Sequence, residues 1–211
     1  MENRGKAGKL DFLLRNSFKS SFTFIMLAVA FLLYAFDGSK ARELCLYAVF
    51  ASTIADLFMM NYQNIPSMIC RNKHFYIGTV FFAVAHILYH LTFLEVLSEN
   101  VSEVSNFNNI IFLFISVCLL LIVFCVLLKE KAIFRRAVLV YLACMCLNFV
   151  SIANCAAEIG GRYYLALLGI IFFFISDGFI LIREIKKDNS FVRKAIWIFY
   201  PLAQLLIIFS I

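Results

Sequence analysis

Two aspartates lie deep inside apolar stretches of the sequence and are the first candidates for chemistry. Asp56 stands within residues 52–58 (STIADLF), and Asp177 stands within residues 173–179 (FFISDGF). The other eleven of the thirteen acidic residues lie near the ends of apolar stretches, in connections or in the N-terminal arm. A carboxylate inside a bilayer costs on the order of 2.5 kcal/mol or more, so it is retained where it faces a bundle interior or a wet cavity. Two such groups can supply one acid and one base. Alternatively, each Asp hydrogen-bonds within the bundle and locks two helices together.

Further polar side chains share faces of two other apolar stretches. His86, Tyr89 and His90 stand at positions i, i+3 and i+4, which places them on one face of a helix. His86 lies well inside its stretch and is a candidate site residue, whereas His90 suits a structural role. Near the C-terminus, Tyr200 and Gln204 are one helical turn apart and are also candidates.

Membrane helices are the elements that must position these groups. Of the 211 residues, 64% are hydrophobic and 15% are charged, whereas a soluble domain has about a quarter charged residues. Runs of the roughly 20 apolar residues that cross a bilayer core occur repeatedly, and they lack the alternation of membrane β-strands. The predicted fold is an all-α polytopic membrane helix bundle with about seven transmembrane helices, near residues 18–36, 44–61, 75–97, 109–128, 137–153, 163–182 and 195–211. We expect a single transmembrane helical domain over residues 18–211, preceded by a basic interfacial arm over residues 1–17.

The basic residues sort to one side of these spans. Sixteen of the nineteen Lys and Arg residues fall in the N-terminal arm or in the connections after the second, fourth and sixth spans. Only Lys40, Arg42 and Arg162 fall on the other side. Because Lys and Arg are enriched in cytoplasmic loops, the split predicts a cytoplasmic N-terminus and a C-terminus outside. The net charge of +6 therefore reflects topology and attraction to anionic lipid, and it does not indicate a nucleic-acid partner.

This topology brings the polar groups to the cytoplasmic half of the bundle. At about 1.5 Å per residue, Asp56 and Asp177 each lie roughly 8 Å from the cytoplasmic ends of their spans. We therefore expect their carboxyl groups to share one polar cavity. The separations from Asp56 to His86 and from Asp177 to Gln204 are 30 and 27 residues, and spans one to three match spans five to seven in orientation. This pattern indicates a parallel internal repeat, with a chance likeness as the alternative.

Around these residues the chain resembles the YhhN-like lysoplasmalogenase family of multispanning membrane proteins. The resemblance runs from Lys19 to the C-terminus. Its motifs, as they stand here, are residues 18–20 (FKS), 55–56 (AD), 82–89 (FAVAHILY), 174–177 (FISD) and 200–204 (YPLAQ). The chain departs from the family pattern at Ser20 and Ala55, where Pro and Gly are usual, and in having seven predicted helices where eight are typical.

The resemblance implies hydrolysis of the vinyl ether bond of a lysoplasmalogen, which is a lysophospholipid, to a fatty aldehyde and a glycerophospho-alcohol. That chemistry needs a proton delivered to carbon, a cation stabilised and a water guided in, and Asp56 and Asp177 can serve as acid and base in either order. His86 is expected to assist them, and the expected substrate-binding residues are Lys19, Tyr89, Tyr200 and Gln204. Lys19 is placed to meet the substrate phosphate, or is a plain positive-inside anchor. No cofactor is expected, because the seven cysteines and three histidines show no metal-ligand spacing.

Two other functional classes are compatible with the same residues. Paired intramembrane aspartates with a histidine at a repeat interface also describe a small proton-coupled transporter. A non-catalytic lipid-binding membrane protein would use the polar groups only to lock the bundle. An enzyme releases aldehyde in detergent, whereas a transporter needs a sealed compartment. The sequence leaves the oligomeric state open.

Overall fold

The structure is a computed structural model that describes residues 21–62, 68–102, 104–185 and 190–211, and these residues form seven α-helices. The first helix is Ser21–Asp37. It is followed by α2 (Lys40–Tyr62), α3 (Met68–Asn100), α4 (Asn106–Val126), α5 (Ala132–Glu158), α6 (Tyr163–Ile185) and α7 (Ser190–Ser210). A short 3₁₀ turn, η1 (Leu127–Lys129), follows α4. The described ranges contain no strand, and the prediction of an all-α bundle of about seven helices is confirmed.

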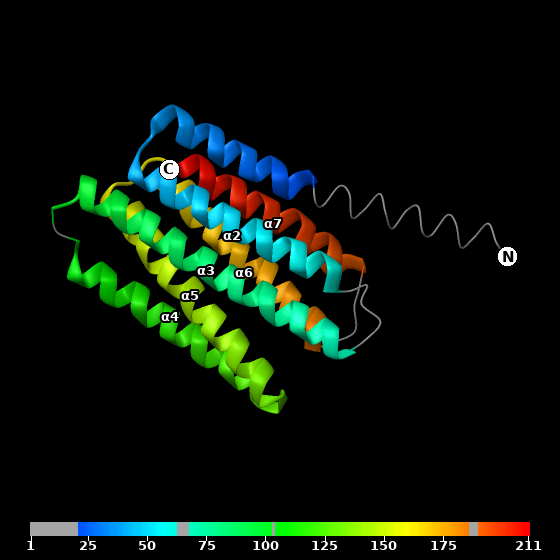
Figure 1. Ribbon diagram of the computed structural model, residues 1–211. Coiled ribbons are helices and arrows are strands. Elements are labelled where there is room, and N and C mark those ends of the chain that lie inside the picture. The colour runs from blue at the N-terminus through cyan, green and yellow to red at the C-terminus, as the bar shows by residue number, and fades with distance from the viewer. Residues whose placement is uncertain (1–20, 63–67, 103, 186–189) are drawn as a thin grey trace.

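Five of these helices, α3 to α7, are long and apolar enough to cross a membrane. The helix Ser21–Asp37 is also apolar but shorter. α2 has a sufficient length, but its first turn contains Lys40, Arg42 and Glu43, and Asp56 interrupts its apolar run. All seven helices run side by side along one axis (Figure 1). The chain is therefore an integral, multi-pass membrane protein.

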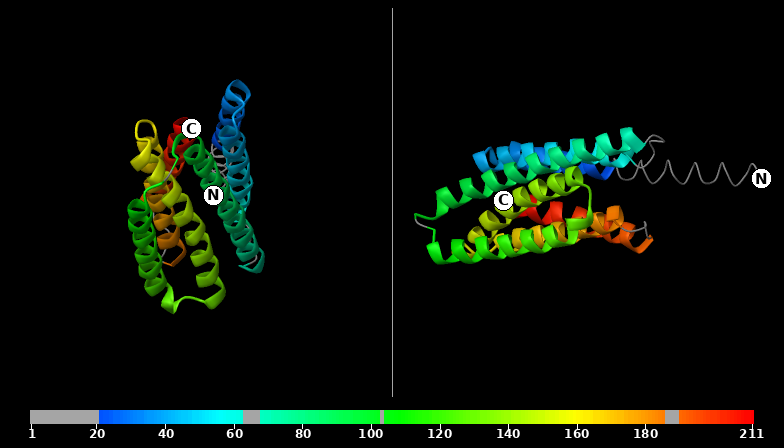
Figure 2. Two further views of the ribbon diagram at one scale, coloured as in Figure 1. Left: turned by 90° about the vertical axis from the view of Figure 1, so that its left-hand side faces the viewer. Right: turned by 90° about the horizontal axis from the view of Figure 1, so that it is seen from below.

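α5 is the central helix of the bundle, because it packs against α3, α4 and α6. Among the helices α2 to α7, the two most extensive pairs are α2 with α3 and α6 with α7. Figure 2 shows α4 and α5 adjacent and joined by a tight connection at one end. The central position of α5 brings its inward-facing polar residues between α3 and α6.

The helices α6 and α7 approach each other closely at Gly169. A Cβ atom added there would lie 2.9 Å from Cγ1 of Ile207 and 3.0 Å from the carbonyl oxygen of Ala203. The side chain of Ile207 could shift, but the backbone carbonyl could not, so glycine is what allows this separation. The close approach fixes α7 against α6, and with it Tyr200, which lies one turn before Ala203.

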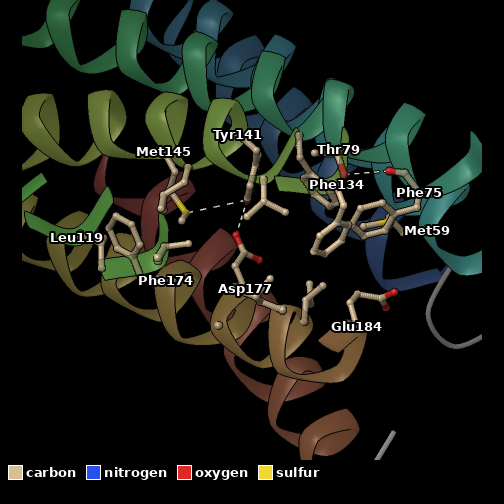
Figure 3. Close-up of a pocket in the computed structure, with 17 residues that line it drawn as sticks. Met59, Phe75, Thr79, Leu119, Phe134, Tyr141, Met145, Phe174, Asp177 and Glu184 are labelled. Carbon is tan, nitrogen blue, oxygen red and sulfur yellow. Dashed lines mark hydrogen bonds between the residues drawn. The ribbon is translucent and has the colours of Figure 1, made fainter. Parts of the chain in front are cut away.

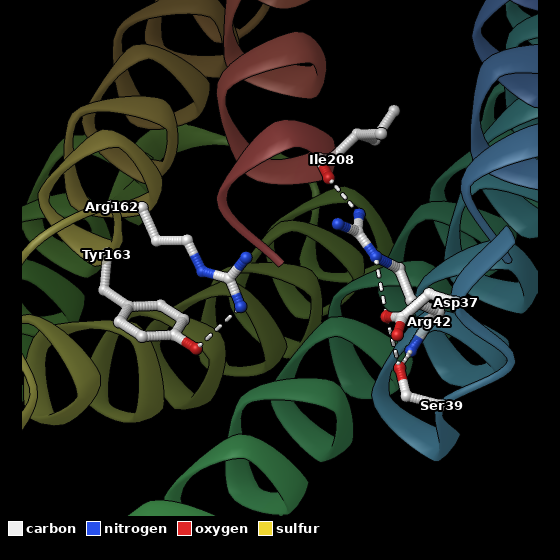
Figure 4. A network of polar contacts seen from close by, with 6 residues as sticks. All are labelled: Asp37, Ser39, Arg42, Arg162, Tyr163 and Ile208. Atoms are coloured by element: carbon white, nitrogen blue, oxygen red, sulfur yellow. Dashed lines mark hydrogen bonds and ion pairs between the residues drawn. The ribbon is translucent and has the colours of Figure 1, made fainter.

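We call the two ends of the bundle the basic end and the opposite end. At the basic end α2 and α6 finish and α3, α5 and α7 begin. At the opposite end, Arg42 donates a hydrogen bond to the carbonyl oxygen of Ile208 (2.8 Å) and forms an ion pair with Asp37 (Nε to Oδ2, 3.4 Å) (Figure 4). A guanidinium group satisfies the otherwise unpaired carbonyl groups at a helix C-terminus. Arg42 thus ties the turn before α2 to the end of α7.

Candidate active site

Asp177 is at one end of a hydrogen-bonded chain that crosses from α6 through α5 to α3. The phenolic hydroxyl of Tyr141 donates to Oδ2 of Asp177. Nε2 of His86 lies 3.1 Å from the same hydroxyl, and Nδ1 of His86 lies 3.2 Å from Nδ2 of Asn148. His86 and Asn148 are almost fully buried, at 1% and 0% exposed.

With Tyr141 as the donor to Asp177, the positions of the other hydrogens in this network follow. Tyr141 has a single hydroxyl hydrogen and gives it to Asp177, so Nε2–H of His86 must donate to the Tyr141 oxygen. Nδ1 of His86 then accepts from the amide of Asn148, which corresponds to a neutral imidazole ring. Every donor in the chain therefore points toward Asp177.

Asp56 has its own hydrogen-bonded chain, which joins α2 to the first helix, α7 and α3. Oδ2 of Asp56 accepts from Oγ1 of Thr23 (3.1 Å) and from the hydroxyl of Tyr200 (2.8 Å). The Gln204 amide nitrogen donates to the Tyr200 hydroxyl (3.3 Å), and the Tyr89 hydroxyl donates to Oε1 of Gln204 (2.5 Å). Because an amide has fixed donor and acceptor ends, Gln204 directs the whole chain toward Asp56.

Aromatic rings separate the two aspartate clusters. The ring of Phe173 packs edge-on against His86 (5.2 Å between centroids) and against Tyr200 (5.7 Å). Phe82 also packs edge-on against Tyr200, at 5.9 Å. Phe82 and Phe173 therefore form an apolar partition between the Asp177 and Asp56 clusters.

A cavity of about 220 Å³ opens on the Asp177 side of this partition. Its walls come from α2 to α6 and are mostly apolar, with the carboxyl group of Asp177 and the hydroxyl of Tyr141 among the few polar groups that face it (Figure 3). Phe82 forms part of the wall. Glu184 lines the cavity at the basic end, two helical turns from Asp177 along α6. A carboxyl group on the wall of an apolar cavity inside a helix bundle can exchange a proton with an apolar ligand largely away from bulk water.

Asp56 does not line this cavity. It lies instead in a much smaller pocket of about 10 Å³, together with Thr23, Tyr200 and Gln204. The prediction that the two carboxyl groups share one cavity is therefore wrong for the described part of the chain. The physical reason is that large aromatic side chains of α3 and α6 fill the space between them. Lys19, the predicted phosphate-binding residue, lies outside the described residues.

The polar residues of the sequence motifs within the described ranges fall in the two clusters: Asp177 and His86 in one, and Asp56, Tyr89, Tyr200 and Gln204 in the other. The model of the YhhN family matches the chain over residues 14–211. The chain belongs to the YhhN family. Searches of curated proteins and of solved structures each found no match.

In this YhhN-family chain, the structure adds three residues that the sequence analysis missed. Thr23 and Tyr141 are the hydrogen-bond donors to Asp56 and Asp177, and Asn148 orients His86. One signal was present in the sequence: Thr23 precedes Asp56 by 33 residues, and Tyr141 precedes Asp177 by 36. In each half of the bundle, the first helix thus donates to the aspartate of the second helix, as a parallel repeat would arrange it.

The candidate site of this family member holds no group of three or more His, Cys, Asp or Glu side chains that could bind a metal ion, within the described ranges. Of the predicted site residues, the structure joins Asp177 with His86, and it joins Asp56 with Tyr200, Gln204 and Tyr89. The two clusters come close to each other on α3, where the ring centroids of His86 and Tyr89 are 6.5 Å apart.

Proposed function

We propose that this YhhN-family protein is an intramembrane hydrolase that cleaves the vinyl ether bond of lysoplasmalogens, giving a fatty aldehyde and a glycerophospho-alcohol. The observation that carries the proposal is the carboxyl group of Asp177, hydrogen-bonded to Tyr141, on the wall of an apolar cavity inside a membrane bundle. Family membership is compatible with this activity. A lysoplasmalogen joins a single hydrocarbon chain to an acid-labile double bond, and the cavity offers both an apolar space and an acid.

In the first step, Asp177 acts as the general acid. Its carboxylic acid gives a proton to the carbon of the double bond that is remote from oxygen, and the π electron pair forms the new C–H bond. The positive charge that results is shared between the other carbon and the ether oxygen. The Asp177 carboxylate left behind is stabilised by the Tyr141 hydroxyl, which donates to it, and in turn by His86.

In the second step, the Asp177 carboxylate acts as the general base. A water molecule adds to the carbon attached to oxygen and gives a proton to Asp177, which restores the acid and leaves a hemiacetal. The hemiacetal then breaks its bond to the glycerol oxygen, and the hydroxyl proton passes to that oxygen. The net reaction consumes one water, and no proton is gained or lost by the protein.

Asp56 acts as the carboxylate of the pair in this proposal. It accepts two hydrogen bonds on one oxygen, an arrangement that suits the ionised form. Its partner Tyr200 packs against Phe82, which lines the cavity, so the negative charge lies just behind the cavity wall. A fixed negative charge at that place favours the cationic intermediate electrostatically.

The remaining predicted residues position these groups. His86 orients Tyr141, and the pair Gln204 and Tyr89 orients Tyr200. We retain Lys19 as a ligand for the substrate phosphate, on the grounds of its sequence motif alone. We also propose that the basic end faces the cytoplasm, as the distribution of Lys and Arg predicts.

The proposal is tested with detergent-solubilised protein and a vinyl ether lysophospholipid, with release of fatty aldehyde as the readout. We expect the wild-type protein to release aldehyde. Asp177→Asn should release it about 100-fold or more slowly, because Asn keeps the shape of the side chain and removes the proton. Asp56→Asn is expected to lower the rate of aldehyde release about tenfold, since it removes a charge that does not touch the substrate. Absence of aldehyde, together with proton-coupled uptake in sealed vesicles, would favour the transporter instead.

A further inference from the structure

We propose that the hydrocarbon tail of the substrate leaves the Asp177 cavity sideways, between α4 and α6, and extends from there into the bilayer. This inference rests on the proposed function and names the part of the protein that receives the apolar end of the lipid. The occupant is a single unbranched alkenyl chain, which is the chain attached to the reacting double bond.

The size of the cavity requires an exit for the tail. Its volume is about 220 Å³, below the roughly 300–1,000 Å³ of pockets that enclose drug-sized ligands. A lysolipid with a long chain is larger than such ligands, so the cavity can hold the reacting bond and its neighbours but not the whole molecule. The rest of the hydrocarbon chain must pass through a gap in the cavity wall.

The packing of the helices leaves such a gap between α4 and α6. Leu119 and Val123 of α4 and Phe174 and Leu181 of α6 all line the cavity. Among the described helices, α4 packs extensively only against α5, and α4 and α6 do not form an extensive pair. The wall there consists of apolar side chains from two helices that are not packed together, and these side chains can move apart at little cost.

Two other directions out of the cavity are blocked or polar. On the side of the opposite end, a row of edge-to-face rings runs from Phe112 of α4 through Phe149 of α5 to Phe174 of α6, with centroids 6.1 and 6.0 Å apart. At the basic end the cavity is lined by Glu184, a charged group unsuited to a hydrocarbon chain (Figure 3). The route past Leu119 and Val123 is lined by apolar side chains and leads to lipid.

The space beside Asp177 is open enough for the first part of the substrate tail. Gly178 lines the cavity, and a Cβ atom added to it would have no atom within 4 Å, apart from its own helix and neighbours. Because Gly178 has no side chain, there is room for the carbon atoms of the alkenyl chain that lie next to the reacting carbon.

The first test compares tail lengths. The variant Val123→Trp fills the proposed exit, and the control Ile122→Trp places the same side chain on the next residue of α4, which is 61% exposed. Each protein is given vinyl ether lysolipids with the same head group and an alkenyl chain of either about 16 or about 6 carbons, since the short chain fits inside the cavity and the long one must use the exit. We expect Val123→Trp to lower the ratio of kcat/KM for the long chain to that for the short chain by about tenfold or more, and Ile122→Trp to leave it unchanged.

A second measurement uses the wild-type protein and needs no turnover. A saturated ether lysolipid that carries a photoreactive diazirine in mid-chain is bound and irradiated, and the labelled peptides are identified by mass spectrometry. Labels on the Leu119–Val123 segment of α4 and on α6 support the exit. Labels confined to α2 and α3, or an unchanged tail-length ratio in Val123→Trp, overturn it. Failure of the proposed function looks different, because the wild-type chain would then release no aldehyde from either substrate.

Discussion

The hydroxyl of Tyr141 on α5 donates to the carboxyl group of Asp177 on α6, at the wall of the apolar cavity. This bond joins two helices and leaves Asp177 facing the space that a ligand would occupy. His86 stands behind Tyr141 and supports it, so the carboxyl group, the phenol and the imidazole act as one unit. The proposed catalysis depends on this unit more than on any other contact.

Replacing Tyr141 by Phe should reduce activity without unfolding the protein. A hydrogen bond to a charged group is worth about 1.5–3 kcal/mol, so losing it should lower kcat by about 10- to 100-fold. Release of aldehyde gives the rate. Tyr163→Phe is the matched control, because Tyr163 is a buried tyrosine at the opposite end of the bundle, where its hydroxyl accepts from Arg162 (Figure 4). Equal losses in both variants would show that the effect comes from general packing.

The pH dependence of the wild-type enzyme should be bell-shaped. Activity falls toward low pH as Asp56 gains a proton and its charge is lost, and it falls toward high pH as Asp177 loses the proton that it must donate. In Asp56→Asn the decline at low pH should disappear while the decline at high pH remains. The reverse pattern, with the decline at high pH lost in Asp56→Asn, would exchange the roles of the two aspartates.

Gly169 and Gly178 should respond oppositely to the same substitution. Gly169→Ala forces a Cβ atom to within 3.0 Å of the Ala203 carbonyl oxygen. We therefore expect the free energy of unfolding to fall by about 1–3 kcal/mol, with a lower Tm in detergent. Gly178→Ala places its Cβ atom in open space and should leave Tm unchanged or slightly raised, because Ala is the better helix former. A Tm for Gly169→Ala equal to that of the wild type would mean that α6 and α7 are not held as closely as described.

The orientation in the membrane can be tested with single cysteines in a cysteine-free background. Ser98 and Ser190 are both exposed, near opposite ends of the bundle. Because most basic residues lie at the basic end, Ser98→Cys should react with an impermeant thiol reagent added to intact cells, and Ser190→Cys should react only after the cells are opened. Labelling of Ser190→Cys in intact cells would reverse the orientation.

The helices and the two aspartates could be predicted because the bilayer imposes simple rules on a sequence. A run of apolar residues of sufficient length must be a spanning helix, and a charged residue inside such a run must face the protein interior. The separation of Asp56 from Asp177 could not be predicted in this way. It depends on how Phe82 and Phe173 fill the space between helices, and depth along a helix gives no information about that lateral packing.

Tyr141 was missed for a related reason. A tyrosine inside an apolar run is compatible with lipid, so its residue type alone does not indicate a site. Its role follows from the central place of α5, which turns Tyr141 toward α6 and toward His86 on α3. Only the spacing of 36 residues to Asp177, matched by the spacing of 33 from Thr23 to Asp56, pointed to it in the sequence.

The most direct test of the central claim is hydrolysis of a vinyl ether lysolipid in heavy water. If Asp177 delivers a solvent-exchangeable proton to carbon, the aldehyde, trapped at once by reduction, should carry a single deuterium on the carbon next to the carbonyl carbon. The same product should form about 100-fold or more slowly in Asp177→Asn. Absence of aldehyde from the wild-type chain, an aldehyde without deuterium, or an undiminished rate in Asp177→Asn would contradict the account.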